Sequence, residues 1–249
     1  MNKAHKLIFF DTETTGNEQK DFLIQLAYKA HPAAGGAESE KFVSLYKPGI
    51  KIPPEASAVH HITNKMVADK LSFQESDDIP IIKKLFEDND AVVVAHNAPF
   101  DLMIIKKEGI EPKKFICTLR VARHLDKEEK IERYNLQYLR YLLDLEIDAT
   151  AHDALGDVLV LEKLFERLKN KILKEENLQE DEVIEKMIEI SSHPSLLRTF
   201  GFGKYSGKRI EEVLAFDRGY LEWLLREKEK GGQVDEDWIY TLKHYLEKN

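Results

Sequence analysis

The sequence lacks several features that would place it in other protein classes. Its 249 residues include one cysteine, Cys117, so an intramolecular disulfide and a cysteine-based zinc site are excluded. It has no apolar run long enough to cross a bilayer and no leader-like N-terminus, so we expect a cytoplasmic protein that does not contact membranes. Repeats and low-complexity tracts are absent, and a chain of this length can bury one substantial core plus a small appendage.

Positive charge is also in short supply. The formal net charge is −8, and residues 191–249 carry as many acidic as basic side chains. A protein of this charge is not expected to offer a large basic surface to the phosphates of a nucleic acid. If nucleic acid is the ligand, we expect weak binding that depends on metal ions, with frequent release of the substrate.

Acidic residues stand where apolar runs end, and the first example is Asp11-Thr-Glu13-Thr-Thr-Gly16. It follows residues 6–10, a short β-rich apolar run that predicts a buried strand. Residues two apart on a strand point to the same face, so Asp11 and Glu13 should project together from the strand's end. Taken alone the pattern is weak, and a turn with acids placed for solubility is the simpler interpretation.

The second example is His96-Asn-Ala-Pro-Phe-Asp101. It follows residues 91–95, which predict a core strand, and residues 100–109 have helical spacing. Asp101 should then lie in the first helical turn, where the helix dipole favours its charge. The alternative is an acid that only caps the helix.

The third example is His152-Asp-Ala-Leu-Gly-Asp157. Apolar spacing predicts an amphipathic helix over residues 154–168, with Asp157 in its first turn and His152 in the loop before it. Histidine titrates near neutral pH, so His152 suits a general base that reaches an attacking water. A surface histidine without a role is the alternative.

Together, these segments predict a metal site. Buried carboxylates repel one another unless a cation neutralises them, and oxygen ligands without cysteine suit Mg²⁺ or Mn²⁺. Two such ions about 4 Å apart would hold a phosphodiester for in-line displacement.

The three motifs, in this order, resemble the DEDDh class of DnaQ-like 3′→5′ exonucleases over residues 5–170. Stretches at 59–63, 117–123 and 135–139 also look like this family. The resemblance implies an α/β, ribonuclease H-like fold in which helices flank a mixed sheet. It implies that backbone groups near Thr14 hold the terminal 3′-hydroxyl and that His152 is the general base. It further implies that four acids hold two Mg²⁺ or Mn²⁺ ions: Asp11, Glu13, Asp101 and Asp157.

Further strands are expected at residues 22–30 and 41–46, joined through a turn at Gly35-Gly36. With the first strand they should form an antiparallel meander, which parallel strands join later. The predicted catalytic domain covers residues 1–170. The highly charged residues 171–195 predict a helical linker with an apolar stripe at Val183, Ile184, Met187, Ile188 and Ile190.

The C-terminal domain, residues 196–249, begins with aromatics, glycines and bases. Aromatics beside bases can stack on nucleobases and contact phosphates, so Lys204, Lys208 and Arg209 are candidate substrate contacts. The alternative is a hairpin whose aromatics fill a small core with Tyr220, Trp223 and Leu224. The segment resembles the small domain of exonuclease X-type proteins, which implies an α+β fold and favours DNA.

The sequence thus predicts a metal-dependent 3′→5′ exonuclease that releases nucleoside 5′-monophosphates, with DNA favoured over RNA. An RNA exonuclease is the first alternative, because no residue indicates how the 2′-hydroxyl would be read. The second is a proofreading or delivery subunit with a polymerase or repair partner. Oligomeric state, processivity and preference for single- or double-stranded ends are not determined by the sequence.

Overall fold

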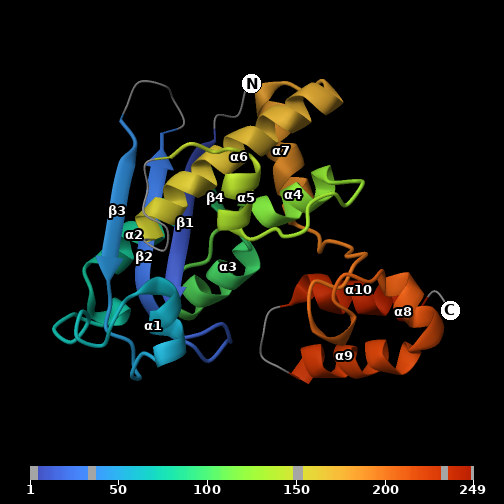
Figure 1. Cartoon of the computed structure of the whole chain (residues 1–249). Helices are drawn as coiled ribbons and strands as arrows, with labels where there is room; N and C mark the ends of the chain where they lie inside the picture. Colours follow the sequence, from blue (N-terminus) through green and yellow to red (C-terminus); the bar gives the residue numbers. More distant parts are fainter. Residues whose placement is uncertain (1–4, 33–37, 148–153, 231–234, 248–249) are drawn as a thin grey trace. The chain divides into compact units, whose positions relative to one another are not determined.

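The computed structural model describes residues 5–32, 38–147, 154–230 and 235–247 (Figure 1). The chain divides into two compact units near Ser192. Within the described ranges, every helix is too short or too polar to cross a bilayer.

The first unit is built on a five-stranded mixed sheet of order β3-β2-β1-β4-β5. Neighbouring pairs β1–β2 and β2–β3 are antiparallel, and β1–β4 and β4–β5 are parallel. The predicted meander with later parallel strands is therefore confirmed, while the Gly35-Gly36 turn lies outside the described residues. The strands are β1 (Lys6–Thr14), β2 (Leu23–His31), β3 (Glu40–Leu45), β4 (Ala91–Ala95) and β5 (Phe115–Cys117).

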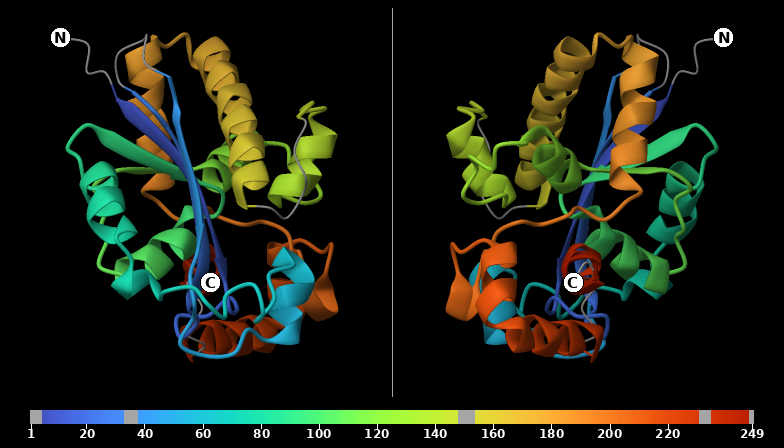
Figure 2. Two further views of the ribbon diagram at one scale, coloured as in Figure 1. Left: turned by 90° about the vertical axis from the view of Figure 1, so that its left-hand side faces the viewer. Right: turned by 90° about the vertical axis from the view of Figure 1, so that its right-hand side faces the viewer.

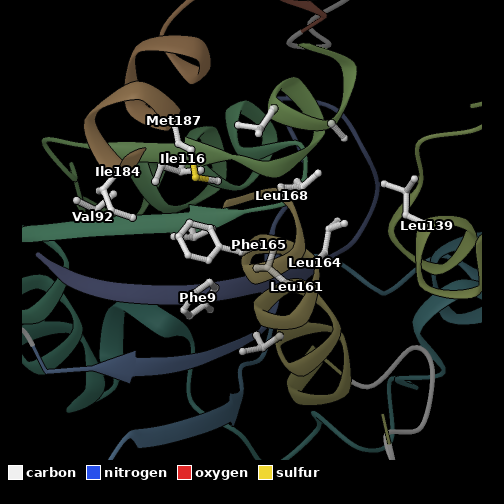
Figure 3. Packing of buried hydrophobic residues seen from close by; sticks show 14 of the residues in the cluster. Phe9, Val92, Ile116, Leu139, Leu161, Leu164, Phe165, Leu168, Ile184 and Met187 are labelled. Carbon is white, nitrogen blue, oxygen red and sulfur yellow. The ribbon is translucent and has the colours of Figure 1, made fainter. Parts of the chain in front are cut away.

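Helices cover both faces of this sheet (Figure 2). Alternation along β1 sends Phe9 to one face, where it meets Phe165, and Ile8 and Phe10 to the other. The Phe9 face packs against α4 (Thr118–Leu125), α6 (Ala154–Glu176) and α7 (Glu180–Ser191), as Figure 3 shows for its core. The opposite face packs against α2 (Asp78–Phe86) and α3 (Ala98–Lys107). Two shorter helices are α1 (Pro54–His60) and α5 (Leu136–Leu142).

The predicted helices are present, with shifted ends. α3 begins at Ala98, two residues before the predicted start, and the chain turns beyond it at Gly109, whose φ is +83°. That angle lies in the left-handed region, where glycine has no Cβ penalty. α6 continues past Leu168 to Glu176 because Ile172 is still fully buried against the core.

The range expected to form a linker, 171–195, packs differently in the structure. Val183, Ile184 and Met187 of α7 enter the same core as Phe9 and Phe165 (Figure 3). The apolar stripe seen in the sequence is therefore buried, and the charges cover the exposed face. The first unit extends to Ser192, and the second begins at His193.

The end of α7 is fastened to β5 and α4 by polar contacts. Arg120, 4% exposed, donates from its guanidinium to the Ser191 carbonyl at 2.7 Å. The Ser191 hydroxyl accepts the Cys117 amide at 2.8 Å and donates to the Met187 carbonyl at 2.7 Å. These bonds hold Ser191, the last residue of α7, one residue before the first unit ends at Ser192.

The second unit is mainly helical. Its loop 199–209 is closed by an isolated bridge between Thr199 and Arg209, which is its one β pairing among the described residues. Phe200 and Tyr205 fill the core with Leu224, as the interpretation of a small aromatic core predicts, whereas Trp223 is 48% exposed. The helices are α8 (Ile210–Phe216), α9 (Arg218–Lys230) and α10 (Glu236–Glu247).

Candidate active site

Three predicted carboxylates meet where β1 ends and α6 begins. One carboxylate oxygen from each of Asp11, Glu13 and Asp157 lies within 4.8 Å of the other two. Asp11 and Glu13 stand two residues apart on β1, opposite Ala27 and Gln25 of β2, so they share a face. Asp157 lies in the first turn of α6. All three are half-buried.

Asp101, the fourth predicted acid, is held beside this group by β1 itself. It lies in the first turn of α3 and is 4% exposed. The Thr12 hydroxyl donates to Asp101 Oδ1 at 2.6 Å, and the Thr12 amide donates to the same oxygen at 3.2 Å. Because Thr12 stands between Asp11 and Glu13, these bonds bring α3 against the metal-binding end of β1.

Crowding changes the acidity of these carboxyls. Burial, with repulsion from Asp101, Glu13 and Asp157, raises the pKa of Asp11 well above its usual range. Burial raises the pKa of Asp101 to about 7, although the hydrogen bonds from Thr12 oppose that shift. A cation among these groups would relieve both the repulsion and the loss of hydration.

The donor set therefore fits a divalent metal. It consists of carboxylate oxygens from three separate segments, which Mg²⁺ and Mn²⁺ prefer over softer ligands. Half-buried acids that raise one another's pKa need a positive charge nearby to compensate their repulsion. The described site residues carry none, so a bound cation would supply it.

Gln137 is a candidate functional residue that the sequence analysis missed. Its side-chain amide donates to Asp157 Oδ1, while its carbonyl oxygen is buried and finds no donor within the described part of the chain. Gln137 lies in α5, whose start is capped by Asn135 accepting the Tyr138 amide at 2.9 Å. Asn135, as an N-cap residue, could have indicated from sequence where α5 begins. No local pattern indicates that Gln137 contacts Asp157 of α6.

His96 connects β4 to the segment that leads into α5. Its Nδ1 lies 2.9 Å from the Thr118 hydroxyl and its Nε2 lies 2.6 Å from the Tyr134 carbonyl. A carbonyl only accepts, so Nε2 carries the proton and Nδ1 accepts from Thr118. Burial lowers the pKa of His96 to about 4, so the ring stays neutral.

The turn after β1 is held by polar side chains and needs a glycine. Thr15 donates its hydroxyl to Asp21 Oδ1 at 2.9 Å and accepts the Phe22 amide at 3.0 Å. A Cβ on Gly16 would stand 2.6 Å from Asp21 Oδ2, so any larger residue would have to displace this carboxylate from its bond with Thr15. The buried Thr14 donates to the Gly16 carbonyl, which fixes the backbone next to Glu13.

His60, in the stretch at 59–63, lies against the same turn. It is 5% exposed, and its Nδ1 accepts the Ile62 amide at 3.0 Å. Burial lowers the pKa of His60, and the Thr14 carbonyl opposes that shift. The ring therefore lies near the backbone of Thr14, the residue for which a substrate contact was expected.

The remaining predicted residues are placed differently. His152 lies outside the described residues. Lys204 and Arg209 are in the second unit, where they contact Asp217 at 3.2 Å and Glu211 at 3.0 Å. Lys208 stands over two rings, 5.8 Å from the centroid of Tyr205 and 5.4 Å from that of Phe216. All three bases are exposed.

Comparison with known proteins identifies relatives of both units. A family model described as Exonuclease matches residues 8–165, and one described as Exodeoxyribonuclease X-like C-terminal matches residues 200–229. Exodeoxyribonuclease 10 of Escherichia coli K12 is 33% identical over 242 residues, which cover 97% of this chain and 99% of that protein. The DNA polymerase III subunit epsilon of Treponema pallidum is 33% identical over 63% of this chain and 73% of its own length.

Solved structures agree with these matches. A structure of exonuclease X in complex with 5′ overhanging duplex DNA superposes with a TM-score of 0.57 and 27% identity, covering 74% of this chain and 99% of that one. Escherichia coli exonuclease I in complex with a dT13 oligonucleotide has a TM-score of 0.58 and 20% identity over 70% of this chain and 43% of its own. The second likeness concerns the fold alone.

Proposed function

The chain belongs to the exonuclease family and is a metal-dependent 3′→5′ exonuclease, and we propose that it acts on DNA and releases nucleoside 5′-monophosphates. The observation that carries the proposal is the meeting of Asp11, Glu13 and Asp157 within 4.8 Å, with Asp101 fastened beside them. We propose that these four acids hold two ions, Mg²⁺ or Mn²⁺.

DNA is proposed as substrate because the Escherichia coli relative is named an exodeoxyribonuclease and is similar across both units. The superposed structure of exonuclease X holds duplex DNA with a 5′ overhang. A cytoplasmic location and a polymerase or repair partner stay predictions.

In the proposed reaction, the chain's own residues orient the acids and handle a proton. Thr12 orients Asp101 and Gln137 orients Asp157, so both carboxylates would present their oxygens to the metal ions in fixed directions. Divalent cations, when bound, stabilise negative charge that develops on the phosphate oxygens. His152 accepts the proton of the attacking water, and backbone groups near Thr14 hold the terminal 3′-hydroxyl.

The test compares end-labelled single-stranded DNA, duplex DNA and RNA of matched sequence, each with Mg²⁺, Mn²⁺ or EDTA. We expect stepwise shortening of DNA from its 3′ end with nucleoside 5′-monophosphates as products, and no cleavage in EDTA. RNA cleaved faster than DNA at equal concentrations would overturn the substrate assignment.

A further inference from the structure

An open hollow of about 380 Å³ lies on and just before α5. This volume is within the range of about 300–1,000 Å³ that is usual for small-ligand sites. Two of its lining side chains are unusually exposed for their type, Tyr141 at 71% and Leu142 at 47%. The lining residues are Arg133, Asn135, Gln137, Tyr138, Tyr141 and Leu142.

The composition of the lining suits a nucleotide as ligand. The described lining residues include two tyrosines, one arginine and two amides, and none of them is an acid, although the chain's net charge is −8. Arg133 is exposed and pairs with no acid among the described residues. Outside the lining, the Arg140 guanidinium lies 5.5 Å from the centroid of the Tyr141 ring and donates to the Ile147 carbonyl at 2.7 Å. Aromatic faces beside cations bind bases and phosphates of a single strand.

The hollow adjoins the metal-binding acids. Gln137 lines it and also donates its amide to Asp157 Oδ1, so one side chain separates the two sites. The segment before α5 is tied to β4 through His96 and the Tyr134 carbonyl, 2.6 Å apart. Asn135 caps the helix itself. The hollow is therefore a fixed extension of the active site.

We propose that this hollow binds a nucleotide of the substrate strand on the 5′ side of the scissile phosphate. The base stacks on Tyr141, and Arg133 contacts the phosphate. This inference rests on the proposed function. An enzyme that removes single 3′ nucleotides has one nucleoside beyond the scissile bond, assigned above to the region of Thr14, so any other bound nucleotide lies 5′ of that bond.

The test uses the full chain with Tyr141→Ala, Tyr141→Phe and Arg133→Ala, and Tyr240→Ala as a matched control for loss of an exposed tyrosine. With single-stranded DNA and Mg²⁺, Tyr141→Ala should raise KM about 5- to 100-fold, the range for losing one stacked base. Turnover at saturation should stay within about 2-fold, because stacking is equal in ground and transition states. Tyr141→Phe and Tyr240→Ala should behave as wild type.

Two readouts separate a nucleotide site from a general loss of structure. Arg133→Ala should lower the salt dependence of binding by about 0.7 in the slope of log K against log salt, the value for one phosphate on a single strand. Both proteins in the second readout carry Asp101→Ala to prevent cleavage. The fluorescence of a 2-aminopurine placed next to the 3′-terminal nucleotide should be quenched on binding to the protein that has Tyr141, and should not be quenched by the Tyr141→Ala protein.

Unchanged KM and unchanged quenching in Tyr141→Ala would overturn the proposal. A change of oligomeric state in Tyr141→Ala with wild-type DNA kinetics would also overturn it and assign the hollow to a contact between copies of the chain. If the wild-type protein fails to cleave any DNA, the proposed function itself fails, which is a separate result.

Discussion

Two of the proposed metal-binding carboxylates accept a hydrogen bond from a neutral side chain. Thr12 donates to Asp101, and Gln137 donates to Asp157. Neutral donors fix the direction of a carboxylate but leave its charge available for a cation, whereas a lysine or arginine would compete with the metal. This choice explains why burial and repulsion still raise the pKa of Asp11 and of Asp101.

Asp101→Ala should abolish cleavage and leave the fold intact or slightly more stable without metal, because it removes a buried charge. Mn²⁺ should raise the Tm of the wild type by binding the native state, and should raise it less in the variant. Calorimetry with Mn²⁺ and with EDTA measures both effects. Asp69→Ala, an exposed acid, is the control. Near-normal turnover in Asp101→Ala would contradict the metal assignment.

Gln137→Ala should lower activity by about 10- to 100-fold, the usual cost of losing the residue that orients a metal ligand. The expected cause is a weaker hold on the cation, so the Mn²⁺ concentration that gives half-maximal rate should rise, and excess Mn²⁺ should restore part of the rate. A Mn²⁺ titration of the initial rate checks this. A titration curve that overlays the wild type would show that Asp157 needs no orientation from Gln137.

His152→Ala should lower turnover by about 10²- to 10⁴-fold, the range for loss of a general base. Metal binding should hardly change, because His152 is not a proposed ligand. The wild-type rate should fall in acid as the imidazole takes up a proton, and His193→Ala should keep both rate and pH profile. Full activity with the wild-type profile in His152→Ala would remove this residue from the mechanism.

At the scale of elements, the site depends on how β4 meets the segment before α5. His96 makes that junction, and its neutral ring uses both nitrogens, one for Thr118 and one for the Tyr134 carbonyl. α5 carries Gln137, which donates to Asp157, a proposed metal ligand. His96 therefore supports Asp157 indirectly, through the position of α5. α5 is short and begins from an exposed cap, so its position depends on such contacts.

The same junction predicts acid sensitivity. Since the pKa of His96 is lowered to about 4 in the fold, the unfolded chain binds the proton more readily between pH 4 and about 6.5. The contribution of neutral His96 to the free energy of unfolding should be intact above pH 6.5 and lost as pH falls to 4. His96→Gln, which has no titrating group, should flatten that part of the stability curve. Urea unfolding at several pH values measures it, and an unchanged slope would contradict the assignment.

At the scale of the whole molecule, chemistry and added substrate contacts are assigned to different units. The acids of the metal site are all in the first unit, while Lys204, Lys208 and Arg209 are in the second. Two of these bases pair with Asp217 and Glu211, whereas Lys208 stands over aromatic rings. Lys208 is therefore the base from which we expect the largest single contribution to DNA binding.

Changing Lys204, Lys208 and Arg209 together to Ala should raise KM and flatten its salt dependence, because fewer phosphate contacts release fewer counterions. Turnover at saturation should hardly change if these contacts are as strong before the reaction as during it. Steady-state rates at several salt concentrations check this. The matched control changes three exposed bases of the same unit, Arg226, Lys230 and Lys243. If KM and salt slope stay constant, the domain has a structural or docking role.

The sequence by itself located the acids of the proposed metal site and most of the elements that carry them. Asp11, Glu13, Asp101 and Asp157 could be identified because each ends an apolar run or opens a helix, and such signals are local. The antiparallel meander and the later addition of parallel strands also followed from local patterns, since short consecutive strands have few ways to pair. The position of β5 (Phe115–Cys117) in the sheet did not.

Only the tertiary structure decided what lies around those acids. Gln137 reaches Asp157 across 20 residues of chain, and His96 reaches Tyr134 across 38. α7 was expected to link two domains, yet it packs in the core because Val183, Ile184 and Met187 bury their apolar stripe on the first unit. Periodicity tells which side of a helix is apolar, whereas the partner of that side is set by packing between segments distant in sequence.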